Sequence, residues 1–207
     1  MKDGKLPMRK SNRQARGFTL LEAVVVVGIM MMLAGLAVIQ SFGSLEGYQA
    51  NSAQDTVASQ LRVARQLAIS QRRNVQIQFN STTTPYSVSY TVLPRPSSGD
   101  PVQPAVTAIL ASQPTFMQEA GVPDTPMGFG TCSGSGICIG AVAGGPAFMQ
   151  FTSSGQFTDA TGVTTLNGTI FLGIPNQVRT ARAVTIMGAT GRVRPYTYVG
   201  GTTNWTE

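Results

Sequence analysis

The sequence contains no histidine and only two cysteines, and no lysine follows residue 17. Without histidine the chain cannot carry out Ser-His-Asp or Cys-His catalysis or build a zinc site with histidine ligands, and two cysteines are too few for a zinc site made of cysteine ligands alone. The acidic residues are scattered, so none is paired at a spacing that suggests general acid and base chemistry. We therefore predict that the protein is not an enzyme and that it uses neither a metal nor a cofactor.

Most of the net charge of +6 comes from the first 17 residues. This lead-in has six basic residues and a single acid, Asp3, whereas the rest of the chain has nine arginines and eight acids. Loss of the lead-in would therefore remove most of the excess positive charge. For this reason the basic pI of the whole chain is weak evidence for a nucleic-acid partner.

Residues 18–39 form an apolar run of 22 residues, FTLLEAVVVVGIMMMLAGLAVI, with one charged residue, Glu22. A helix of this length measures ~33 Å, which is enough to span a hydrocarbon core of about 30 Å. The basic lead-in before it is typical of a cytoplasmic flank. The run therefore predicts a transmembrane helix over 18–40, with the C-terminal part of the chain outside the cytoplasm.

Two simpler interpretations compete with this one. A secretory signal peptide has a shorter apolar region, of about 7–15 residues, and a cleavage site after small residues. A plain single-span anchor leaves Glu22 unexplained, because an ionised side chain costs about 2.5–3.5 kcal/mol at the membrane centre and usually has a partner. A cut between Gly17 and Phe18 would supply that partner, since it creates an α-amine four residues before Glu22.

The stretch GFTLLE, followed by about twenty apolar residues, resembles the class III leader of type IV pilins and type II secretion pseudopilins. The resemblance implies that a prepilin peptidase cuts after Gly17, removes residues 1–17 and N-methylates Phe18. It also implies that Glu22 pairs with the N-terminus of a neighbouring subunit during assembly. The chain departs from many major pilins in having Ile39 where they have a helix-bending proline.

Beyond the apolar run, small apolar residues recur at steps of three and four over 41–73, which predicts a helical continuation with one apolar stripe. The stripe consists of Ala50, Ala53, Val57, Leu61, Ala64 and Ala68. Such a stripe either packs on the protein's own domain or forms a coiled-coil seam, and we favour the first.

Alternation of apolar and polar residues then predicts strands. The predicted strands are 75–79, 86–92, 147–151, 169–174, 182–187 and 192–199. The residues Gly188-Ala-Thr-Gly191 predict a hairpin turn between the last two. The predicted fold class is therefore α+β, in which a long N-terminal helix packs on a C-terminal antiparallel β-sheet head, 74–207, with a loop-rich insertion near 94–145.

Several stretches resemble the H-type pseudopilins and the FimT group of minor pilins. They are QRRNVQIQF at 71–79, FTSSGQF at 151–157, TIFLGI at 169–174, RTARAVTIM at 179–187 and GATGRVR at 188–194. The resemblance implies a minor subunit of a type IV pilus or a type II secretion system. Such a subunit sits in the bacterial inner membrane with its head in the periplasm, and assembles with other pilins or pseudopilins into a filament or its tip.

Cys132 and Cys138 enclose the five residues SGSGI, and an exported location favours a disulfide over free thiols. The glycine-rich surroundings do not indicate a phosphate-binding loop. The G-x-x-x-x-G-K-[ST] pattern is missing, and no lysine lies nearby.

Four side chains of the last long strand, Arg192, Arg194, Tyr196 and Tyr198, share one face because side chains alternate along a strand. Guanidinium groups hold phosphates and aromatic rings stack on bases, so this face is a candidate surface for nucleic acid.

Arg179 and Arg182 lie close by in the sequence and belong to the same candidate DNA-binding set. In the FimT group a C-terminal GRxR motif is associated with DNA binding during natural transformation, and Gly191-Arg192-Val193-Arg194 matches it. The alternative is that the arginines pair with acids of another subunit. We favour a purely assembly role and keep DNA uptake as the second hypothesis.

Overall fold

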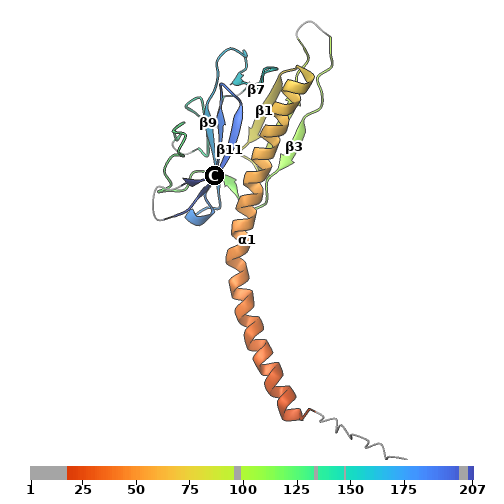
Figure 1. Cartoon of the computed structure of the whole chain (residues 1–207), viewed down its shortest axis with the longest axis vertical. Coiled ribbons are helices and arrows are strands. Elements are labelled where there is room, and N and C mark those ends of the chain that lie inside the picture. The colour runs from red at the N-terminus through yellow and green to blue at the C-terminus, as the bar shows by residue number, and fades with distance from the viewer. Residues whose placement is uncertain (1–17, 96–98, 133–134, 147, 201–204) are drawn as a thin grey trace, which may run out of the picture. The chain divides into compact units, whose positions relative to one another are not determined.

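In the computed structural model the chain divides into two compact units, residues 1–42 and 43–207 (Figure 1). The structure describes residues 18–95, 99–132, 135–146, 148–200 and 205–207, except for the side chains of 37–44. The helix α1, Leu20–Gln71, contributes to both units, and all the strands belong to the second.

In the first unit, residues 18–36, which are the last two residues before α1 and its first turns, expose apolar side chains. Phe18 is 79% exposed, Leu20 83% and Met32 75%. Within the described residues, no helix is long and apolar enough to cross a membrane. The predicted span 18–40 extends into 37–40, whose side chains lie outside the described residues.

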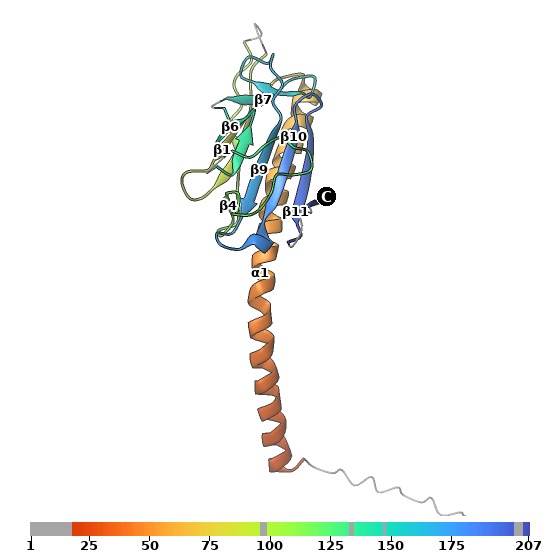
Figure 2. The same ribbon diagram turned by 90° about the vertical axis from the view of Figure 1, so that its left-hand side faces the viewer.

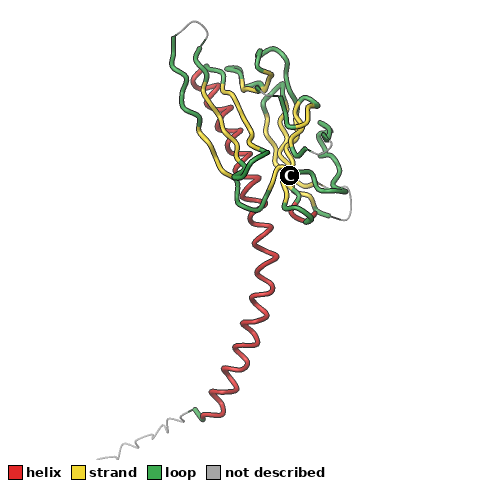
Figure 3. The backbone as a smooth tube through the Cα atoms, turned by 180° about the vertical axis from the view of Figure 1, so that it is seen from behind, coloured by secondary structure: helices red, strands yellow, loops and turns green. Residues whose placement is uncertain are grey.

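The second unit combines the rest of α1 with two antiparallel sheets, seen as two groups of strands in Figure 3. One sheet has the order β3-β2-β1-β7-β8, and the other the order β12-β11-β10-β9-β5-β6, with β4 also paired to β9. Figure 2 shows β9, β10 and β11 side by side with α1 behind them.

The first sheet consists of β1 (Val75–Asn80), β2 (Ser87–Val92), β3 (Val106–Ile109), β7 (Met149–Phe151) and β8 (Phe157–Asp159). The second consists of β5 (Ile137–Ile139), β6 (Val142–Ala143), β9 (Gly168–Gly173), β10 (Arg182–Met187), β11 (Arg192–Tyr198) and β12 (Trp205–Thr206), together with β4 (Thr115–Phe116). A 3-10 turn, η1 (Val178–Thr180), precedes β10.

The predicted stripe of α1 is buried within its own unit. Ala50, Ala53, Val57, Leu61, Ala64 and Ala68 are all 0% exposed. Most of them share one core with residues of both sheets, such as Ile77 of β1 and Val184 of β10. The prediction of a helix packed on its own domain is confirmed, and the coiled-coil interpretation is wrong.

A buried glutamine ties α1 to the second sheet. Gln54 is 5% exposed, and its Nε2 donates hydrogen bonds to the carbonyl oxygens of Ala183 on β10, at 2.9 Å, and Tyr196 on β11, at 2.8 Å. A buried amide needs such partners, because leaving it without them costs about 1–3 kcal/mol. The two bonds fix the position of α1 beside β11, which matters for the site described below.

The α+β class, the long helix and the antiparallel head are confirmed, but the head has two sheets where one was predicted. The stretch 94–145 is also less irregular than predicted, because it contains β3, β4, β5 and β6. These strands are two to four residues long. Such short segments are too brief to show a period of two, and β4 and β5 are held by pairing with the distant β9.

The core predicts a clear difference between neighbouring positions of α1. We expect Leu61→Ala to lower the free energy of unfolding by about 2–5 kcal/mol, because it leaves a cavity in a fully buried site. The matched control is Val63→Ala, since Val63 lies two residues away and is 43% exposed. Urea unfolding of the full chain in detergent measures both, and equal losses for the two variants would contradict this description of the core.

Candidate functional site

The N-terminus of α1 is capped by a side chain of the same chain. Thr19 immediately precedes the helix, and its Oγ1 accepts a hydrogen bond of 3.2 Å from the backbone N–H of Glu22. A threonine at the N-cap with a glutamate three residues later is the capping-box pattern. A carboxylate in the first turn also interacts favourably with the positive end of the helix dipole. Glu22 therefore stabilises the start of its own helix, without a partner subunit. Gly17 lies outside the described residues.

The predicted nucleic-acid face of β11 is only partly open. Arg192 is exposed and Arg194 is half-buried, but Tyr196 and Tyr198 are only 5% and 9% exposed. The prediction that both tyrosine rings stack on bases is therefore wrong.

The tyrosines are buried because parts of the chain distant in sequence cover their face of the sheet. Tyr196 and Tyr198 belong to a second apolar cluster with Phe171, Val122 and Trp205. The ring centroids of Tyr198 and Trp205 lie 5.3 Å apart. Alternation along β11 groups the four side chains correctly but does not reveal this cover.

The two arginines before β10 bind within the head. Arg182 is 7% exposed, and its Nε donates a hydrogen bond of 2.7 Å to Asn51 Oδ1 on α1. Burial also lowers the pKa of Arg182. Because its side chain is not accessible to a ligand, the inclusion of this residue in a DNA-binding surface is wrong. Arg179 is more exposed, but its Nη2 lies 2.6 Å from Glu46 Oε2 and holds η1 to the helix.

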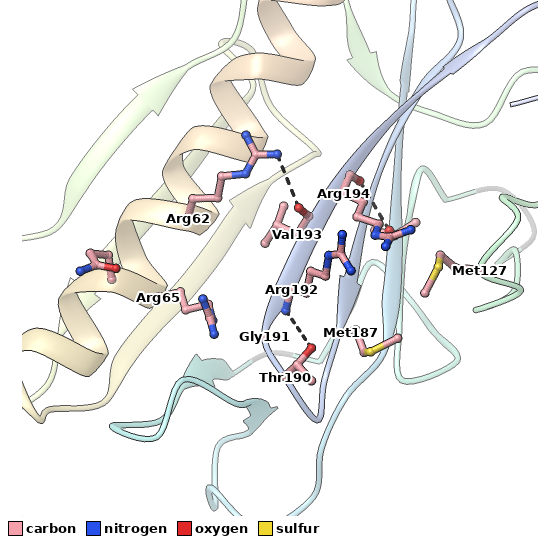
Figure 4. A pocket seen from close by; sticks show the side chains of 11 residues that line it. Arg62, Arg65, Met127, Met187, Thr190, Gly191, Arg192, Val193 and Arg194 are labelled. Atoms are coloured by element: carbon pink, nitrogen blue, oxygen red, sulfur yellow. Dashed lines mark hydrogen bonds between the residues drawn. The ribbon is translucent and has the colours of Figure 1, made fainter. Parts of the chain in front are cut away.

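Arg192 and Arg194 instead face a cavity of about 700 Å³ together with two arginines of α1, Arg62 and Arg65 (Figure 4). We call this cavity, defined by the four arginines, the arginine groove. Arg62 and Arg65 lie off the apolar stripe of α1, and they are more than 120 residues away from β11 in the sequence. Their spacing of three residues puts them on one face of the helix, which is the signal that was available.

The glycine of the Gly-Arg-Val-Arg stretch has a steric reason. Gly191 has φ +61, and a Cβ there would collide with the carbonyl oxygen of Gly155 and lie 2.8 Å from Arg65 Nε. Arg65 Nε donates a hydrogen bond of 3.2 Å to that same carbonyl. The turn before β11 therefore needs glycine so that the helix arginine can come close to it.

The charge of the arginine groove is poorly balanced. None of the described residues that line it is acidic. Glu207 is the acid that reaches one of its arginines, with Oε2 at 3.3 Å from Arg194 Nη1. The pKa of Arg194 is raised, first by a hydrogen bond with the Tyr196 side chain and then by Glu207. Such a site suits an anion.

Cys132 and Cys138 form a disulfide with an S–S distance of 2.02 Å. Cys138 lies on β5, which pairs with β9, so the bridge ties the preceding glycine-rich loop to the second sheet. The described residues include no cluster of histidine, cysteine, aspartate or glutamate side chains that could hold a metal ion.

Residues 12–38 match the family model described as the prokaryotic N-terminal methylation motif. The N-terminal segment of the chain therefore carries this methylation motif. This match and the helix-on-sheet head agree with the type IV pilin-like prediction made from the leader.

Among solved structures, the type IV minor pilin FimU of Pseudomonas aeruginosa is similar to this chain. The two share 18% sequence identity with a TM-score of 0.43, and the alignment covers 71% of this chain and 87% of that one. No curated protein sequence matches the chain.

The contact between Glu46 and η1 predicts a dependence of stability on pH. The pKa of Glu46 is lowered, first by a hydrogen bond from Gln177 and then by Arg179. Because folding lowers this pKa, the ionised carboxylate stabilises the fold at pH values above its ordinary pKa of 4.5. This contribution is lost as the pH falls through the folded-state pKa.

We therefore expect wild type to be more stable than Glu46→Gln at pH 7, and the difference to shrink below pH 4.5. Thermal unfolding of both proteins from pH 7 to pH 3 measures it, with Asp55→Asn, an exposed position on α1, as the control. A difference that stays constant over this range would contradict the assignment.

Proposed function

We propose that the protein is a minor pilin or pseudopilin, a filament subunit of a type IV pilus or a type II secretion system. The observation that carries the proposal is the methylation motif over 12–38, which includes the Gly17-Phe18 junction and Glu22. The exposed apolar surface of residues 18–36 supports it, because such a surface needs a membrane or neighbouring helices to cover it.

In this proposal a prepilin peptidase cuts after Gly17 and methylates the new N-terminus at Phe18. The cut leaves a positive α-amine beside Thr19, the residue that caps the helix. This amine adds to the partial positive charge of the helix N-terminus. In an apolar environment the added charge needs a carboxylate, and Glu22 of the same or a neighbouring subunit supplies it.

Subunit assembly then follows from the same segment. The apolar side chains of residues 18–36 pack against neighbouring helices in the inner membrane and in the filament. The head is displayed in the periplasm, away from these contacts. The protein acts as a building block and as the substrate of the peptidase, with no catalytic role of its own.

Glu22→Gln separates the charge of this residue from its place in the helix cap, since glutamine also serves in a capping box. We expect normal cleavage and methylation at Phe18, measured by mass spectrometry of the mature N-terminus. We expect incorporation into filaments to fall by about tenfold or more, because an unpaired amine remains in an apolar environment.

The control for this experiment is Thr19→Ser, which keeps the hydroxyl of the cap. If Glu22→Gln assembles as well as wild type, the carboxylate acts as a helix cap and the pairing is wrong. An N-terminus other than methylated Phe18 would contradict the proposed cleavage after Gly17.

DNA binding for uptake is a second candidate function, and the arginine groove is the observation that favours it. Two arginines of β11 and two of α1 line one cavity that contains no acidic side chain among its described lining residues. Arginine suits phosphate because its guanidinium makes charge-assisted, bidentate hydrogen bonds. Residues 191–194 also match the GRxR motif, which in the FimT group is associated with DNA binding, and this resemblance supports the same function.

We expect Arg192→Gln/Arg194→Gln to weaken DNA binding by about tenfold or more at moderate salt, and to lower the slope of log K against log salt by about 2. Fluorescence anisotropy with a labelled duplex, titrated at several salt concentrations, measures both quantities. The control is Arg72→Gln, which removes one arginine charge at a position that is not part of the groove lining. An unchanged affinity and slope in the double variant would exclude the groove as the DNA site.

A further inference from the structure

The arginine groove has two walls from different parts of the chain. Arg62 and Arg65 belong to α1, and Arg192 and Arg194 belong to β11 (Figure 4). Gln54 and the buried stripe hold these two elements together, so arginines of both elements line one cavity. A ligand in the groove would meet positive charge from both walls.

The hydrogen bonds of the two helix arginines use backbone carbonyls and leave their positive charge in place. Arg65 Nε donates to Gly155 O, and Arg62 Nη2 lies 3.5 Å from Val193 O, a long contact. Carbonyl oxygens orient a guanidinium group but carry no full negative charge. The Nε of Arg194 is buried and has no hydrogen-bond partner among the described residues.

The edge of β11 is poorly suited to accept a strand from a partner. Pro195 has no N–H to donate, and β12 already pairs with Thr197 and Tyr198. The long contact from Arg62 also occupies the carbonyl of Val193. Side chains, and above all the guanidinium groups, are therefore the binding elements of this surface.

Glu207 reaches the groove from an anchored position. Trp205 of β12 packs on Tyr198, and its Nε1 donates hydrogen bonds to the carbonyls of Pro123, at 3.2 Å, and Asp124, at 3.1 Å. Glu207 follows β12 directly and is half exposed, with 50% of its side chain accessible. Its backbone is thus held beside Arg194 while its carboxylate remains able to leave.

Resting on the proposed DNA-binding function, we infer that the polyanion site is two-sided and that Glu207 competes with the ligand for it. The helix arginine Arg62 contacts phosphates together with Arg192 and Arg194. The carboxylate of Glu207 occupies Arg194 in the free protein and is displaced when a phosphate binds. Glu207, an acid of the same chain, therefore lowers the affinity of the site for a polyanion.

The two parts of this inference change affinity in opposite directions. We expect Glu207→Gln to bind a labelled DNA duplex about two- to fivefold more tightly, because a partly exposed ion pair is weak and its loss frees one arginine. Glutamine keeps the size of the side chain and an oxygen that can accept from Arg194. We expect Arg62→Gln to weaken binding about three- to tenfold and to lower the salt slope by about 1.

The experiment uses the full chain in detergent and fluorescence anisotropy at several salt concentrations. Asp55→Asn is the control for Glu207→Gln, and Arg72→Gln is the control for Arg62→Gln. Both control residues lie on or next to α1 and do not line the groove. Circular dichroism and thermal unfolding establish that each variant keeps the fold.

The outcomes separate this inference from the function on which it rests. If wild type binds DNA and loses binding in Arg192→Gln/Arg194→Gln, while Glu207→Gln and Arg62→Gln match their controls, the groove binds DNA but the inference is wrong. If neither wild type nor Glu207→Gln binds at low salt, the DNA-binding function and the inference both fail. Tighter binding by Glu207→Gln together with weaker binding by Arg62→Gln supports the two-sided site.

Discussion

The close approach of α1 to the two sheets is the constraint on which the rest of the head depends. Alanines at positions 53, 64 and 68 have short side chains, so the helix backbone lies near the strands. Gln54 can then reach two strand carbonyls, and Arg65 can reach the turn at Gly155. A larger side chain on the stripe would move the helix outward and separate the two walls of the arginine groove.

The parts of the fold that follow a long local period could be predicted from the sequence. The helix, β1, β2, β10 and β11 each show their period over six or more residues, and the structure places them within a few residues of the predicted bounds. The strands between residues 94 and 145 could not be predicted in this way. Two of them, β4 and β5, depend on pairing with the distant β9, and none of the four carries a repeat long enough to indicate a strand.

The candidate site shows the same limit for side chains. Counting arginines and assigning strand faces indicated Arg192 and Arg194 correctly as groups outside the main core. The same reasoning could not tell them from Arg182, which is buried against Asn51, or from Arg179, which pairs with Glu46. The difference lies in what other segments place beside each guanidinium group, and that is decided by tertiary packing.

The cap at Thr19 has a consequence for maturation. The helix begins with a hydrogen bond supplied by a residue on the C-terminal side of the Gly17-Phe18 bond, so under the proposed function this cap stays with the mature subunit. Cleavage at that bond would change the charge at the helix start, while both partners of the bond between Thr19 and Glu22 would stay in the chain. In that proposal, maturation would act as an electrostatic change at a helix start that carries its own cap.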